Sequence, residues 1–132
     1  MPNDLFKLLS MKRTVLSGIL ILCSVLLAAQ SNEVRSALQQ YRYKEALLLL
    51  ENEPETAENL LLKAESLEKL YNYADALTVY ERLLQNNPDD TELLISAAEC
   101  ASQAGDTESA LKNWLKADSL SPGNLFFQTK KA

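Results

Sequence analysis

Apolar side chains in the second half of the chain recur at the spacing of amphipathic helices. One stripe has the i, i+4, i+7, i+11 spacing that gathers side chains on a single helical face, and it consists of Leu60, Ala64, Leu67 and Tyr71. A second stripe follows it and consists of Tyr73, Ala76, Leu77, Tyr80 and Leu84. The pattern predicts two helices joined by a tight turn. Ala64 and Ala76 are expected where the helices approach most closely, because small side chains are needed there.

The same pattern occurs a second time, displaced by thirty-four residues. The matching landmarks are Ala64 and Ala98, Ala76 and Ala110, Leu77 and Leu111, Tyr80 and Trp114, and Pro88 and Pro122. A fixed period of this size indicates helix pairs that stack side by side. The prolines separate the units because they cannot continue a helix interior. In the last unit, Gly105 predicts the turn between the helices, and Asp106 predicts the cap of the helix that follows.

The unit resembles the tetratricopeptide repeat family. It has small residues at places eight and twenty, an aromatic residue at place twenty-four and proline at place thirty-two. The tryptophan of the family at place four is replaced by Leu60 and Leu94, and its glycine at place eight by alanine. The resemblance implies an all-α fold, a right-handed superhelical solenoid of about three antiparallel helix-turn-helix repeats. It also implies that Tyr80 and Trp114 fill the gap against the neighbouring helix.

A shortened unit precedes the two full ones. Residues 41–47 echo residues 71–77 at a spacing of thirty, whereas Pro54 keeps the full spacing to Pro88. The missing residues amount to about one helical turn, so the second helix of this unit is expected to be shorter with its faces in register. The stripe of its first helix consists of Val34, Ala37, Leu38 and Tyr41. The repeat domain is therefore expected at 30–122, with repeats at about 31–56, 57–90 and 91–124.

The first 29 residues have the composition of a secretory signal peptide. Lys12 and Arg13 precede an apolar run at 14–29, and polar residues follow at once. Cleavage after Ala29 would make this an exported bacterial protein of the periplasm or cell envelope. The alternative is a membrane anchor at the N-terminus that is not cleaved, although the run is shorter than the ~20 residues that cross a bilayer as a helix.

The C-terminal residues 123–132 are expected to form a tail or the start of a further repeat. Leu125, Phe126 and Phe127 follow Pro122 at the place where a fourth unit would begin. A repeat array needs a polar cap at its end, since the last unit otherwise exposes an apolar face. Three arrangements satisfy this need: a short turn over Trp114, a longer array of which this chain is the front part, or another chain. The longer array is the favoured interpretation.

Charge and composition exclude several functions. The chain has 13 basic and 18 acidic residues, and without residues 1–29 it carries 10 and 17, a net charge of −7. This acidity disfavours nucleic acid and anionic membrane surfaces as partners. The chain has no histidine, the commonest general base and metal ligand. We therefore predict no catalytic residue, no metal and no cofactor, and a protein that is not an enzyme.

The remaining chemical groups are expected in the core. Cys100 lies among alanines and is predicted to be a small buried residue, with a redox-active thiol as the alternative. The aromatic residues at repeat positions are predicted to pack in the core, and they are Tyr41, Tyr43, Tyr71, Tyr73, Tyr80 and Trp114.

The resemblance also implies a site. In the family, the second and ninth places line a concave groove that holds partner peptides. These places are acidic here, with Leu61 and Ile95 as an apolar floor, so the predicted partner-binding groove consists of Glu58, Leu61, Glu65, Glu92, Ile95 and Glu99. Its expected flanks are Glu68, Lys69, Ser102 and Gln103. Such a groove would prefer a basic or neutral extended segment, or an amphipathic helix. An ordinary solvated helix face is the alternative.

These observations predict a scaffold for protein–protein interaction that binds a partner segment in its groove. The chaperone-binding variety of the family grips a C-terminal carboxylate with basic residues, which are replaced here by Leu61, Glu65, Glu92 and Ser96. The alternatives are a self-associating or structural element, and an accessory segment of a larger envelope protein or enzyme. The oligomeric state is left open.

Overall fold

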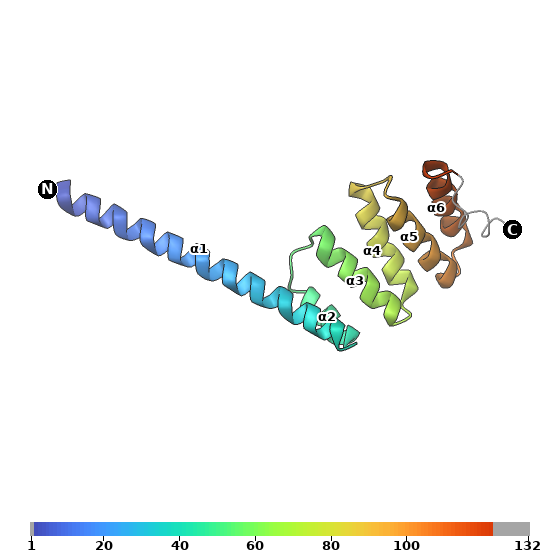
Figure 1. Ribbon diagram of the computed structural model, residues 1–132, viewed down its shortest axis with the longest axis horizontal. Coiled ribbons are helices and arrows are strands. Elements are labelled where there is room, and N and C mark those ends of the chain that lie inside the picture. The colour runs from blue at the N-terminus through green and yellow to red at the C-terminus, as the bar shows by residue number, and fades with distance from the viewer. Residues whose placement is uncertain (1, 123–132) are drawn as a thin grey trace.

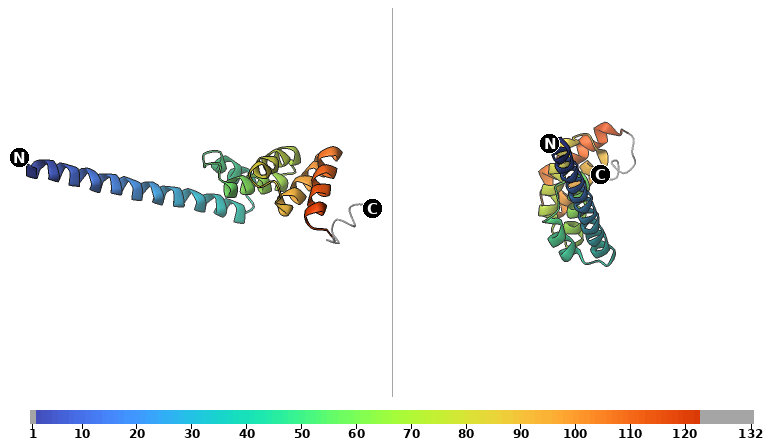
Figure 2. Two further views of the ribbon diagram at one scale, coloured as in Figure 1. Left: turned by 90° about the horizontal axis from the view of Figure 1, so that it is seen from above. Right: turned by 90° about the vertical axis from the view of Figure 1, so that its left-hand side faces the viewer.

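The computed structural model describes the backbone of residues 2–122 and the side chains of residues 3–24 and 32–122. In this part of the chain the regular structure is entirely α-helical (Figure 1). The helices are α1 (Pro2–Gln39), α2 (Tyr43–Leu50), α3 (Ala57–Lys69), α4 (Tyr73–Asn86), α5 (Thr91–Ala104) and α6 (Thr107–Leu120). Consecutive helices pack against each other, and α1 projects from one end of the stack (Figures 1 and 2). The predicted all-α array of helix pairs is confirmed.

The helices fall into two sets. We call the C-terminal part of α1, with α3 and α5, the A helices, and α2, α4 and α6 the B helices. An ion pair joins Glu55 to Arg82, and a second joins Asp89 to Lys116 with 3.1 Å between Oδ1 and Nζ. The members of the second pair lie thirty-four residues after those of the first. The period in the sequence is therefore a period in space.

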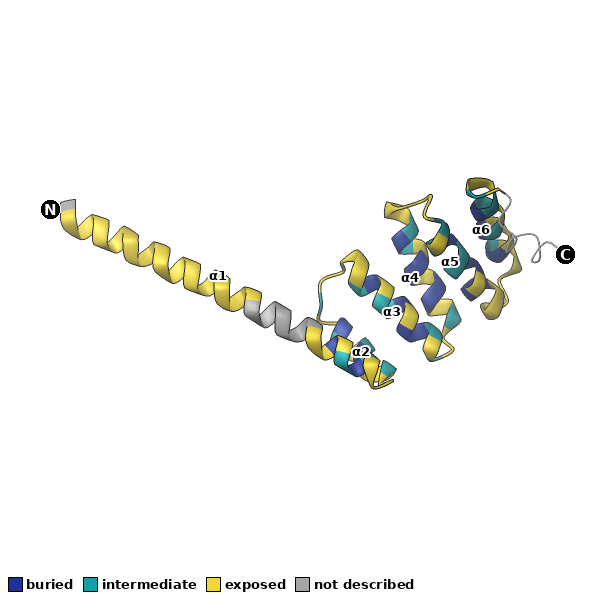
Figure 3. Cartoon of the chain, viewed as in Figure 1, coloured by how far each residue is buried: buried dark blue, intermediate teal, exposed yellow. Residues whose placement is uncertain are grey.

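The core lies between the helices (Figure 3), and its main cluster contains mostly alanine and leucine side chains with one buried tyrosine. Ala64 and Ala76 are fully buried in one cluster, as predicted, so α3 and α4 approach closely. Tyr80 is buried in the same cluster, and the half-buried Trp114 packs against this cluster. The predicted role of the two aromatic residues as space-fillers between helices agrees with this packing.

Local signals in the sequence set the ends of the helices. Asp90 Oδ1 accepts hydrogen bonds from the N–H groups of Glu92 and Leu93 at 3.0 and 3.1 Å, so it caps α5. Gly105 ends α5 with a φ of 84°, which costs glycine nothing. Asp106 then accepts a hydrogen bond from the N–H of Ser109, and hydrogen bonding by the side chain and then the backbone of Ser109 lowers the pKa of its carboxyl. As predicted, α2 is short, with 8 residues against 14 in α4.

Two aromatic residues do not pack as predicted. Tyr41 and Tyr71 were assigned to buried stripes, but both follow the end of a helix and are 79% exposed. Their φ angles of 58° and 61° place them in the left-handed region, the position that Gly105 holds in the third unit. The chain turns there, so the helical periodicity no longer applies. Each contacts the next tyrosine edge-on, Tyr41 against Tyr43 and Tyr71 against Tyr73. The prediction of core packing is wrong for Tyr41 and Tyr71.

The N-terminal segment is continuous with the first repeat. The domain boundary predicted at 29 and 30 lies inside α1, so one helix joins the proposed signal segment to the first A helix. Every side chain from Asn3 to Ser24 is exposed (Figure 3). Among the described residues, none of the helices combines the length and the apolar character needed to cross a membrane. Cleavage after Ala29 stays a prediction, and Leu125, Phe126 and Phe127 lie outside the described residues.

Candidate partner-binding groove

The six predicted groove residues lie on two A helices. Glu58, Leu61 and Glu65 belong to α3, and Glu92, Ile95 and Glu99 belong to α5. All are exposed except Ile95, which is half-buried and packs against Leu94 and Ala117. Each helix therefore presents two carboxylates separated by an aliphatic residue. That these side chains hold a partner stays a prediction.

The first carboxylate of this set is neutralised within the chain. Arg35 Nη2 of α1 lies 2.6 Å from Glu58 Oε1 of α3, in an exposed ion pair. Arg35 precedes Glu65 by thirty residues, so it holds the ninth place of the shortened unit. The pair thus joins place nine of one unit to place two of the next. Sequence reasoning missed Arg35 because it considered the two full units alone, although the thirty-residue offset was available.

At the interface between the second and third units, the same two places are both acidic. Place nine of the second unit is Glu65, and place two of the third is Glu92. Where the first interface has an arginine and a glutamate, the second has two glutamates. Neither carboxylate has an ion-pair partner among the described residues. Two negative charges at these places repel each other unless a cation comes between them.

A hollow of about 310 Å³ lies between α3, α5 and the start of α4. It is lined by Glu68, Tyr73, Glu99, Ser102 and Gln103. It joins one predicted groove residue, Glu99, to three of the four predicted flanking residues, and Lys69 is not among its lining. Tyr73 was missed, because it was assigned to the core. Two carboxylates and an aromatic ring together suit a cationic side chain.

The hollow is anchored to the core through Glu68. Tyr80 Oη donates a hydrogen bond to Glu68 Oε1, which links this lining carboxylate to the core. Burial, reinforced by Glu68, raises the pKa of Tyr80, so this phenol remains a donor. Burial is also the main cause that raises the pKa of Cys100 to about 12, with Glu68 adding to it. The buried thiol is therefore protonated at neutral pH, and the predicted burial of Cys100 is confirmed.

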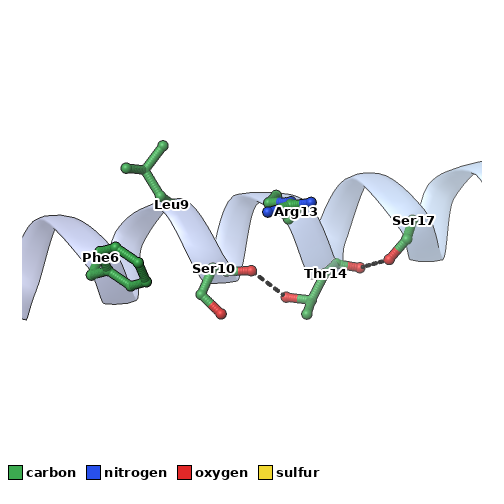
Figure 4. A pocket seen from close by; sticks show the side chains of 6 residues that line it. All are labelled: Phe6, Leu9, Ser10, Arg13, Thr14 and Ser17. Carbon is green, nitrogen blue, oxygen red and sulfur yellow. Dashed lines mark hydrogen bonds between the residues drawn. The ribbon is translucent and has the colours of Figure 1, made fainter.

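The rest of the described chain offers little for chemistry. A shallow depression on α1 is lined by Phe6, Leu9, Ser10, Arg13, Thr14 and Ser17 (Figure 4). The hydroxyl groups of Thr14 and Ser17 donate to the backbone of the helix itself, as when Ser17 Oγ donates to the carbonyl of Thr14 at 3.0 Å (Figure 4). One helix supplies every lining residue, so no second wall encloses a ligand. Within the described residues, no three or more His, Cys, Asp or Glu side chains gather in a way that could hold a metal ion.

Comparison with known proteins supports the repeat interpretation. Residues 67–112, from the end of α3 into α6, match a model of the tetratricopeptide repeat family. No curated protein sequence matches this chain. Among solved structures, PcrH in complex with the chaperone binding region of PopB is 19% identical, with a TM-score of 0.62 over 78% of this chain and 86% of that chain.

Two further structures give similar agreement. The type III secretion translocator chaperone SycD of Yersinia enterocolitica is 17% identical, with a TM-score of 0.60 over 78% of this chain and 80% of that chain. MamA AMB-1 is 22% identical, with a TM-score of 0.64 over 74% of this chain and 56% of that chain. At these identities the similarity shows a shared fold, so the chain has stacked tetratricopeptide-type helix pairs. The prediction that the chain is not an enzyme agrees with these similarities, since the matched model is that of a repeat family and SycD is a chaperone.

Proposed function

We propose that this chain is a non-catalytic scaffold that holds a basic segment of a partner protein along the A helices α3 and α5. The observation that supports this function is the contrast between two equivalent interfaces. Arg35 neutralises Glu58 inside the chain, whereas Glu65 and Glu92 occupy the equivalent places and have no ion-pair partner in the described part of the chain. A lysine or arginine of the partner would supply there the charge that Arg35 supplies one unit earlier.

The neighbouring features fit the same partner. A second basic side chain can enter the hollow of Glu68, Glu99 and Tyr73, while Leu61 and Ile95 offer apolar contact between the charges. The stacked helices form a stiff surface, so the scaffold loses little conformational entropy when the partner segment lies on it. PcrH, a protein of the same fold, has been solved with the chaperone binding region of another protein, which supports a peptide-holding role for the architecture.

Selection of peptides from a random display library on the full chain tests the proposal. We expect the selected peptides to be enriched in lysine and arginine. We expect Glu65→Arg to weaken their binding by about tenfold or more, because the new arginine pairs with Glu92 as Arg35 pairs with Glu58. Glu108→Arg makes the same charge change on an exposed residue of α6 and serves as the control. An equal loss of binding in both variants would mean that the overall charge causes it. Unchanged binding in Glu65→Arg would refute the groove.

A second candidate function is self-association through α6. Leu77 is 8% exposed because the third unit covers it, but the equivalent Leu111 is 55% exposed on the last described helix. Leu115 lies beside it and is also exposed. A second copy or a further unit would cover these side chains. Sedimentation over a range of concentrations distinguishes the functions, because a monomer at every concentration excludes self-association.

Export is a separate proposal and depends on residues 1–29. The basic pair Lys12 and Arg13 and the apolar run after it support a signal sequence, with periplasm or cell envelope as the destination. Fractionation of a bacterial host with intact-mass measurement tests it. A soluble periplasmic product that begins at Gln30 is expected, a full-length product in the membrane fraction would indicate the anchor, and a full-length cytoplasmic product would refute export.

A further inference from the structure

A basic segment follows the acidic repeats. Residues 123–132, which we call the C-terminal segment, contain Lys130 and Lys131 and no acidic residue. Residues 30–122, in contrast, contain 8 basic and 17 acidic residues. Every arginine among those 8 is already in an ion pair with a carboxylate of the fold. The C-terminal segment also carries an apolar run just before its lysines, and this run is Leu125, Phe126 and Phe127.

The C-terminal segment leaves the fold near the start of α5. Lys116 Nζ of α6 lies 3.1 Å from Asp89 Oδ1 and also donates to the carbonyl of Pro88, so the last part of α6 lies beside the beginning of α5. Glu92 of the predicted groove belongs to the first turn of α5. Pro122, the last described residue, follows Lys116 by only six residues. The segment therefore begins at the end of α5 that carries a groove carboxylate.

The C-terminal segment is long enough to reach the rest of the groove. Lys130 follows Pro122 by eight residues, which span up to about 26 Å when extended. Helix α5 has 14 residues and is therefore about 21 Å long. The two lysines can thus reach carboxylates along the whole of α5, and Glu65 of α3 holds the place that pairs with Glu92 in the repeat.

We propose that the C-terminal segment occupies the acidic groove of its own chain and competes there with the partner segment. This regulation rests on the groove proposed above. A lysine of the segment brings to Glu65 and Glu92 the charge that Arg35 brings to Glu58 one unit earlier. A tethered segment has an effective concentration on the order of millimolar, so even a weak contact is populated.

The groove suits this segment better than the exposed leucines of α6 do. Leu61 and Ile95 offer the groove apolar contact beside its carboxylates, so both the apolar run and the lysines find complementary groups. Leu111 and Leu115 of α6 are each followed by a lysine, which repels a basic segment. Charge therefore directs the segment to the A helices.

Zero-length cross-linking of the full chain tests the occupancy. A carbodiimide joins an amine to a carboxylate that it contacts, and mixing ¹⁵N-labelled with unlabelled chains distinguishes bonds within a chain from bonds between chains. We expect Lys130 or Lys131 to couple within the chain to Glu65 or Glu92. Coupling to Glu108 of α6 instead would place the segment over the exposed leucines and overturn the inference. Coupling only between chains would make a second copy the occupant, and coupling to neither helix would leave the groove empty; both results overturn it.

Competition with the peptides selected above provides a second readout. The double variant Lys130→Glu and Lys131→Glu should bind them about three- to tenfold more tightly, because the groove is no longer occupied by the segment. Lys44→Glu with Lys112→Glu makes the same charge change at two exposed lysines of the B helices and serves as the control. Unchanged affinity in the first variant, or equal tightening in both, would refute competition.

The two proposals can fail separately. If Glu65→Arg weakens peptide binding but the lysine variant leaves it unchanged, the groove binds a partner without competition from the segment. If the cross-links to Glu65 or Glu92 form but Glu65→Arg does not weaken peptide binding, the groove holds its own segment and the partner function is wrong.

Discussion

Residues 3–24 of α1 and the helices α3 to α6 are both helical and both rich in aliphatic side chains, yet they differ completely in burial. Every side chain of the first region is exposed, whereas the repeats bury two core clusters. In the repeats, polar residues confine the apolar ones to a stripe, and another helix of the array faces that stripe. In residues 3–24 of α1 the apolar side chains surround the helix, and no other described element faces them. Complementary faces, rather than apolar content, produce the core.

The largest expected effect is the difference in stability between two leucine-to-alanine substitutions, one in each region. Leu94→Ala should lower the free energy of unfolding by about 2–5 kcal/mol, because it leaves a cavity where Leu94 is 2% exposed. Leu16→Ala should change it by less than about 0.5 kcal/mol, because Leu16 is 64% exposed. Urea denaturation followed by circular dichroism measures both. A comparable loss in Leu16→Ala would mean that α1 has a packing partner.

The two cysteines test the same contrast by reactivity. Cys23 is exposed on α1, and Cys100 is buried. The pKa of Cys100 is raised from 9.0 to about 12, which lowers its thiolate population roughly a thousandfold at neutral pH. Alkylation of the folded chain with iodoacetamide should therefore modify Cys23 alone, and both should react in denaturant. Rapid modification of Cys100 in the folded chain would contradict the packing.

The raised pKa of Cys100 also predicts a pH dependence. The folded state retains a proton that the unfolded state releases, so this contribution to stability is complete below about pH 9 and is lost as the pH rises toward 12. Thermal unfolding of the chain at a series of pH values measures this loss. The same series on Cys100→Ala is the control, because this variant should lose stability less steeply above pH 9. Equal slopes in the two proteins would refute the assigned pKa.

A smaller effect is expected at the turns within the repeats. Gly105→Ala should lower the free energy of unfolding by roughly 1–2 kcal/mol, because an alanine is strained at a φ of 84°. Tyr71→Gly, at the equivalent turn, should change it less, because the relief of strain is offset by the lost contact with Tyr73. Chemical denaturation of both variants measures the difference. A neutral Gly105→Ala would mean that the turn relaxes to another conformation.

These turns show where sequence reasoning succeeded and failed. The repeat landmarks predicted the positions of α3 to α6 because small residues, prolines and caps act locally. Tyr41 and Tyr71 were misassigned because their spacing continues the helical stripe past the end of the helix. A left-handed residue breaks the periodicity there, and glycine marks the same turn only in the third unit. A tyrosine in that conformation carries no signal in a single sequence.

The candidate sites depend on contacts that the sequence does not contain. The groove residues could be assigned to α3 and α5 from their places in the repeat, but the pairing of Arg35 with Glu58 depends on how adjacent units stack. Asn113 occupies the same place as Val79, which the period makes visible, but its burial depends on how the helices of the last unit pack.

The smallest effect should come from removing the exposed region altogether. Deletion of residues 1–24 should leave the free energy of unfolding of the repeats within about 0.5 kcal/mol, because no described side chain of this segment is buried. The slope of the free energy with urea should also stay the same, since that slope reports surface buried on folding. Deletion to residue 38 is the matched control, because it also removes Val34 and Ala37 from the core and should be strongly destabilising. A large loss from the shorter deletion would mean that the apolar helix docks on the repeats in solution, and the contrast between the two regions would then disappear.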